Sequence, residues 1–201
     1  MITQKRAAIN IGTVLKQATE ADLTNGHDWY EVARERCQLI SDDYKVPLEL
    51  VAHVVAILSP GVRWETNVSA ARKLFAAGAD SFDALILAGY RRSVDKAKRA
   101  IINYRAGLPF TSIISGRKVI EFAENILKPN RTRQVTLDTH AISVAMGRRF
   151  LTRRAPDLRI AEFTRISKAY IQVAEEHNIM PNQCQAITWL VWRRLHNGRT
   201  K

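Results

Sequence analysis

The sequence predicts an all-α protein, because apolar residues recur at helical spacing along most of the chain while the alternation typical of strands is nearly absent. Nine glycines and six prolines interrupt the chain only rarely. With 201 residues, 46% of them hydrophobic, it can bury one complete core but is short for two full-sized domains. We therefore expect a single helical domain over residues 1–201, with roughly nine helices.

The most apolar expected helix covers Pro47–Leu58, with apolar residues on every side. Pro47 suits a first helical turn, and the turn residues of Ser59–Gly61 end the helix. This pattern indicates the central core helix.

The other expected helices are punctuated by glycine and opened by capping residues. Ser93 and Ser115 are the expected N-caps of two of them, and the second would place Gly116, Arg117 and Lys118 in its first turn. The expected helices are Trp64–Ala77, a short one from Ser81, Ser93–Ala106, one from Ser115, Asp138 to Arg149, one marked by Phe163, Ile166, Tyr170 and Val173, and one from Pro181 that carries Trp189 and Trp192.

The positive charge is concentrated near the C-terminus. The formal net charge is +12, and residues 128–201 carry 14 basic and 5 acidic side chains, against 17 and 14 in residues 1–127. A basic surface of this kind favours a polyanionic partner, above all DNA, although a solvated cationic face without a ligand remains open.

The two cysteines, Cys37 and Cys184, are too few for a disulfide framework, a four-thiolate metal site or an iron–sulfur cluster. No stretch of about 18 apolar residues occurs, and Met1–Leu15 has no continuous apolar core. We expect an intracellular protein, neither secreted nor membrane-spanning, without metal or cofactor, and a monomer.

Asp138 opens the segment Leu137–Ala141 after a β-branched, extended stretch. A carboxylate in the first turn of a helix is favoured by the unpaired amides and the macrodipole. Because aspartate is among the commonest N-caps, this local pattern fits a structural cap as well as a catalytic base.

Five short motifs occur in one order along the chain, and together they resemble the helix-hairpin-helix DNA glycosylase superfamily, the endonuclease III-like enzymes. The resemblance covers about residues 48–195 and implies helices in two lobes around a cleft. The matching motifs are Leu58-Ser59, Asn67, Gly89-Tyr90 with Lys96-Ala97, Gly116-Arg117-Lys118 and Leu137-Asp138-Thr139-His140.

The resemblance implies that Asp138 is the catalytic carboxylate and that Lys118 is the amine that attacks the sugar in bifunctional members. Arg117 could supply the charge that activates such a lysine, and a phosphate contact is the simpler alternative for Lys118. Gly116 and Arg117 would offer amides to a DNA phosphate. The chain departs from the family in two ways, since Ile114 replaces the first hairpin glycine and the cluster cysteines are missing.

Other positions are expected to contact DNA by the same resemblance. Arg63 would fill the stack vacated by an extruded base, and Trp64 would stack on a base, with core packing as the alternative. Asn67 and Lys96 match family motifs. Gln183, beside Asn182 and Gln185, could reach a nucleotide, with helix capping as the alternative. His140 points away from Asp138 and is expected to be structural.

Three functions follow as hypotheses. The first is a DNA N-glycosylase, monofunctional or with lyase activity, that excises a flipped base in the cytoplasm of a bacterial or phage-infected cell. The second, on the same fold, is a transferase that joins an amine or amino acid to an activated thymine in hypermodified phage DNA. The third is a non-catalytic DNA-binding protein.

Overall fold

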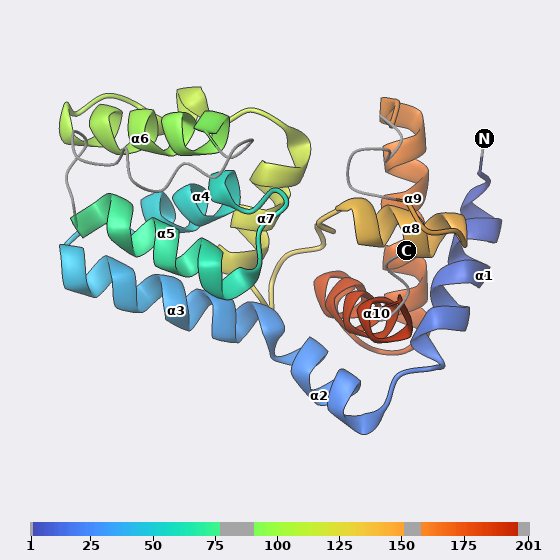
Figure 1. The fold of residues 1–201 in the computed structure, drawn as a ribbon. Helices are drawn as coiled ribbons and strands as arrows, with labels where there is room; N and C mark the ends of the chain where they lie inside the picture. Colours follow the sequence, from blue (N-terminus) through green and yellow to red (C-terminus); the bar gives the residue numbers. More distant parts are fainter. Residues whose placement is uncertain (1, 77–90, 151–157, 197–201) are drawn as a thin grey trace. The chain divides into compact units, whose positions relative to one another are not determined.

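The computed structural model describes residues 2–76, 91–150 and 158–196, and every regular element in these ranges is a helix (Figure 1). The all-α prediction is confirmed. The elements are α1 (Gln4–Leu15), α2 (Glu20–His27), α3 (Trp29–Tyr44), α4 (Leu48–Leu58), α5 (Trp64–Ala76), α6 (Arg91–Arg105), the 3₁₀ turn η2 (Phe110–Ile113), α7 (Arg117–Leu127), α8 (Thr139–Met146), α9 (Ile160–Glu176) and α10 (Pro181–His196).

The chain divides into two compact units. Unit 1 combines Met1–Glu31 with Lys128–Lys201, and unit 2 is the internal segment Val32–Leu127. Both ends of the chain therefore contribute to one unit. The single-domain arrangement stays a prediction.

In unit 2, α4 packs against α5, α6 and α7, and Figure 1 shows it within this group of helices. All residues from Leu50 to Leu58 are buried, so the predicted central core helix is confirmed. Pro47 differs slightly from expectation, because it precedes the first turn in an extended conformation. Its fixed φ suits that position equally well.

In unit 1, α10 packs against α1, α2, α8 and α9, and α1 packs against α8 and α9. The core is apolar, with Ile11 of α1, Tyr170 of α9 and Ile187 of α10 almost fully buried. Gly26 of α2 lets that helix approach α10 closely, because a Cβ there would lie 2.6 Å from the Cα of Ile187. The α1 helix is thus an integral part of this core.

Three predicted helix ends are wrong. Ser93 lies inside α6, which already includes Arg91. Ser115 does not cap α7, because the carbonyl of Gly116 accepts the first hydrogen bonds, from the amides of Val119 and Ile120. The α8 helix ends at Met146, before Arg149, since Gly147 takes a left-handed conformation with φ 65°. The helix expected from Ser81 lies outside the described residues.

Across the described ranges, no helix combines the length and apolar character needed to cross a membrane.

Candidate functional site around Asp138

Asp138 is the N-cap of α8 in unit 1. Its Oδ1 accepts a hydrogen bond of 2.7 Å from the amide of Ala141, and the side chain is half-buried. The unpaired amides at a helix N-terminus stabilise negative charge at this position. The capping role is therefore real, and Oδ2 takes no part in the capping bond.

The segment before Asp138 is anchored through buried side chains. Val135 and Leu137 belong to the unit 1 core. Between them, the hydroxyl of Thr136 accepts a hydrogen bond of 3.1 Å from the Tyr30 hydroxyl, which also lies 2.8 Å from Oε1 of Gln185. Because this network ties α3 and α10 to the residue two before Asp138, it fixes the start of α8.

The Tyr170 hydroxyl lies behind the start of α8 and donates to the carbonyl of Ala141 at 3.2 Å. Burial raises the pKa of Tyr170 well above its ordinary value, and the negative charge of Asp138 adds to the shift. The Tyr170 hydroxyl near Asp138 is therefore neutral.

Aromatic rings gather beside the first turn of α8. His140 meets Trp189 of α10 edge-on with ring centroids 6.5 Å apart, and Trp189 meets Trp29 of α3 in the same way at 6.1 Å. The Arg193 guanidinium lies 4.5 Å from the centre of the Trp189 ring. His140 thus packs against α10, as a structural histidine would. Trp192 is buried and Trp189 is half-buried.

The hairpin-like segment lies in unit 2. Gly116 adopts φ 97°, a conformation that disfavours any side chain, although a Cβ would meet open space. Ile114 has φ −76° and ψ 114°, which any residue can adopt, so the missing first glycine is no obstacle to this turn. The Lys96 amine donates to the Ser115 hydroxyl at 2.6 Å, and the half-buried Lys118 lies in the first turn of α7. The structure therefore brings Lys96 to the turn that holds Gly116, Arg117 and Lys118.

Arg117 has an intrahelical partner that the sequence analysis missed. Its Nε donates to Oε1 of Glu121 at 3.3 Å. Glu121 is 7% exposed, and its Oε2 has no hydrogen-bond partner in the part of the chain that the structure describes. Burial raises the pKa of Glu121 to about 7, against the opposing effect of Arg117. The spacing of four residues would have suggested this pair.

The loop before α5 exposes Arg63, and Trp64 is half-buried as the first residue of that helix. Gly61 makes the turn with φ 74°. Arg63 therefore remains available to a partner.

The side chains of two expected DNA contacts, Asn67 and Gln183, are buried. Asn67 is 2% exposed and donates from Nδ2 to the carbonyl of Val55 at 3.1 Å. Gln183 is 5% exposed; its Oε1 accepts from the amide of Met180 at 2.9 Å and its Nε2 donates to the carbonyl of His27. The fully buried Asn182 donates to the carbonyl of Pro129 at 2.7 Å. These amides hold the segments around α10 together.

The candidate residues thus form two groups, each within one unit. Unit 1 holds Asp138 with its aromatic neighbours, and unit 2 holds Lys96, Arg63 and the Gly116–Lys118 turn. Among the residues in the described ranges, no group of three or more His, Cys, Asp or Glu side chains is placed to hold a metal ion. The Gly89-Tyr90 motif lies outside those ranges.

The model of a protein family matches residues 1–196 of the chain. The chain belongs to DUF7178, a family of unknown function. None of the curated proteins and none of the solved structures matches the chain.

Proposed function

We propose that the protein binds DNA and cleaves the N-glycosidic bond of an extruded base, with Asp138 as the catalytic carboxylate. The observation that carries this proposal is the placement of Asp138. Asp138 is the N-cap of α8, and its side chain is half-buried. Its Oδ1 accepts the capping hydrogen bond, whereas its Oδ2 takes no part in that bond. The motif order of the sequence supports the same role.

The charge of unit 1 favours DNA as the partner. Its residues include 17 basic and 9 acidic side chains, or +8, against 14 and 10 in unit 2, or +4. The catalytic carboxylate would thus act in the more cationic unit, where attraction to the phosphates outweighs its own repulsion.

In the proposed reaction, the bond between C1′ and the base nitrogen breaks, and the base leaves with the electron pair. The charged Asp138 carboxylate stabilises the positive charge that develops on the sugar. It then accepts a proton from the water that attacks C1′, while the departing base gains a proton. The products are the free base and an abasic site.

The first test compares the wild-type protein with Asp138→Asn on duplexes that carry a panel of modified bases, followed by alkali. Wild-type protein should yield strand breaks at abasic sites, and the variant should be slower by about 100-fold or more. Because asparagine caps helices as well as aspartate does, the variant should keep its melting temperature and DNA affinity. Equal activity of the two proteins would refute the role of Asp138.

Two further readouts separate related reactions. Borohydride trapping of a protein–DNA adduct that disappears in Lys118→Ala would show that the Lys118 amine attacks C1′ with loss of the base. Mass spectrometry of the treated DNA distinguishes base removal from base modification, since a transferase would increase the mass of the base. DNA binding without either change would support a non-catalytic protein.

A further inference from the structure

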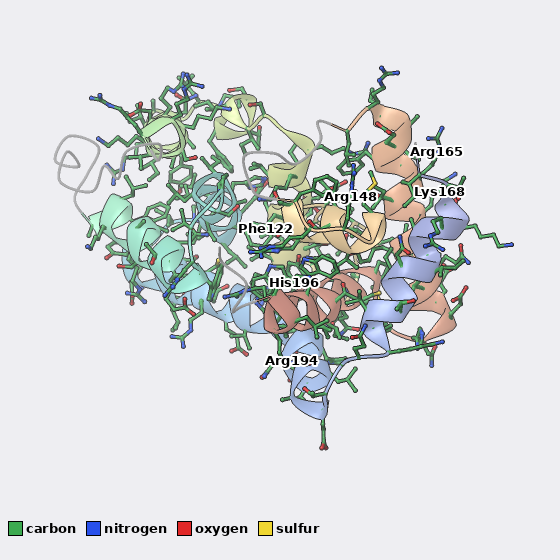
Figure 2. The ribbon with its side chains drawn as sticks, turned by 45° about the vertical axis from the view of Figure 1, so that its right-hand side comes forward. Phe122, Arg148, Arg165, Lys168, Arg194 and His196 are labelled. Carbon is green, nitrogen blue, oxygen red and sulfur yellow. The ribbon has the colours of Figure 1, made fainter. Side chains whose placement is uncertain are left out.

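The segment from Arg148 to Lys168 concentrates the positive charge of unit 1. It contains six arginines, one lysine and only two acidic residues. Within its described part, Arg148 and Lys168 are exposed, and Figure 2 labels both with Arg165 on the α8–α9 part of unit 1. The local charge is therefore far denser than the average of the chain.

Helical spacing places several of these side chains on the solvent face of α9. Arg165 and Lys168 are three residues apart and thus share one side of the helix. The opposite side carries Phe163, Ile166 and Tyr170 into the core. On that side Lys168 is exposed and Arg165 is half-buried.

Ile160, the first residue of α9, is 80% exposed. The other exposed large hydrophobic residues of the described ranges reach at most 56%, the value of Leu108. An isoleucine at the tip of a helix, beside arginines, is the type of side chain that DNA-bending proteins insert between base steps.

The amides of the first α9 turn are less suited to binding an anion, because the Glu162 carboxylate lies there and accepts from the amide of Arg159 at 3.3 Å. Anions would therefore meet the side chains of Arg148, Arg165 and Lys168. The Arg148 guanidinium is already oriented by the Phe150 ring, with 4.7 Å between the guanidinium carbon and the ring centre.

We propose that Arg148, Ile160, Arg165 and Lys168 form a DNA-docking surface, the α9 surface, in which the cations hold the phosphate backbone and Ile160 wedges between two base steps. Duplex DNA fits better than an anionic membrane. Two of the three cations of this surface are arginines, whose planar fork matches phosphate oxygens. One exposed isoleucine is also too little apolar area to anchor a helix in lipid. The inference takes from the proposed function only that DNA is the partner.

The charge test measures the affinity of a fluorescent duplex at several salt concentrations. Arg148→Glu combined with Lys168→Glu should weaken binding and reduce the slope of log K against log salt by about 2, since each phosphate contact contributes about 0.9. The matched control is Arg34→Glu with Arg36→Glu on α3, which makes the same change in net charge at two exposed arginines. Equal slopes for the two double variants would overturn the proposal.

The wedge test uses a duplex with 2-aminopurine, whose fluorescence rises on unstacking. Wild-type protein should raise the signal at some position of the probe, and Ile160→Ala should abolish the rise while the salt slope stays unchanged. The control Ile102→Ala removes an exposed isoleucine of α6 and should behave as wild type. The wedge would be refuted if Ile160→Ala kept the fluorescence rise. It would also be refuted if Ile160→Ala and Ile102→Ala both lost it.

The outcomes separate this inference from the proposed catalysis. Docking that depends on the α9 surface, without base removal, would leave the inference standing and refute the glycosylase. Base removal by the wild-type protein, with unchanged DNA affinity in the Arg148 and Lys168 double variant, would support the glycosylase and refute the α9 surface. Binding to phosphatidylserine vesicles but not to duplex DNA would overturn the α9 surface as a DNA site. Circular dichroism of each variant checks that it is folded.

Discussion

At the scale of single residues, Glu121 is a buried carboxyl, and one of its oxygens has no hydrogen-bond partner in the described ranges. Its pKa rises from 4.5 to about 7. The unfolded chain therefore releases this proton at lower pH than the folded protein does. The contribution of Glu121 to the free energy of unfolding falls as pH rises from 4.5 to about 7, and then stays constant.

We predict that Glu121→Gln removes this dependence. The difference in free energy of unfolding between variant and wild type should grow in favour of glutamine across that pH range and level off above it, because glutamine carries no proton to lose. Urea denaturation of both proteins at a series of pH values measures the difference. Parallel stability curves would show that the carboxyl titrates normally in the folded protein.

The sequence indicates some residues of the candidate site but not the burial of others. Asp138 is a candidate because its position at a helix start and its place in the order of motifs are both properties of the sequence. The buried state of Gln183 and Asn67 depends on contacts with His27 and Val55, which sequence spacing does not specify. Polar residue types favour the surface only on average. The sequence alone therefore does not show which amide side chains are buried.

At the scale of elements, Gly26 and Gly12 form a matched pair of helical glycines. A Cβ at Gly26 would lie 2.5 Å from Cγ1 and 2.7 Å from the backbone nitrogen of Ile187, whereas a Cβ at Gly12 meets nothing within 4 Å. We predict that Gly26→Ala destabilises the protein by about 1–3 kcal/mol, because α2 must move off α10.

Gly12→Ala should instead stabilise the protein by about 0.5–1 kcal/mol through the better helix propensity of alanine. Thermal and urea unfolding of the two variants measure both effects. A stabilising Gly26→Ala would mean that α2 and α10 do not pack as closely as the structure has them.

The pattern of correct and missed helices also has physical causes. Helices with strong apolar periodicity, such as α4 and α9, were identified from the sequence. The three helices before Pro47 were not assigned, although Ala7, Ile11, Val14 and Leu15 recur at helical spacing in α1. The errors in helix ends at Ser93 and Ser115 arose because serine is a favourable cap wherever it stands, while the observed bounds depend on neighbouring backbone.

At the scale of the whole molecule, the chain divides into two compact units, and the segment of unit 2 interrupts unit 1 in the sequence. Length and hydrophobic content constrain how much core can be buried, but they do not show which distant segments share it. The concentration of charge in residues 128–201 was visible in the sequence. That these residues pack with α1 and α2 follows only from the structure.

The packing of residues 128–201 with α1 and α2 can be tested with a chain that begins at Val32. Such a chain lacks α2 and also α1, which supplies Ile11, Val14 and Leu15 to the core around α9 and α10. It also lacks Tyr30, which bonds to Thr136 and Gln185. Residues 32–127 retain α5, α6 and α7, which pack on α4.

Hydrogen exchange should therefore become fast in α8, α9 and α10 of the shortened chain and stay slow in α4, because an apolar core that loses one of its layers no longer offsets the entropy of ordering the rest. Adding residues 1–31 as a separate peptide should restore protection in α9 and α10. Slow exchange in these helices without the peptide would show that the C-terminal segment folds without α1. In that case the start of α8, and with it the position of Asp138, would not depend on Tyr30.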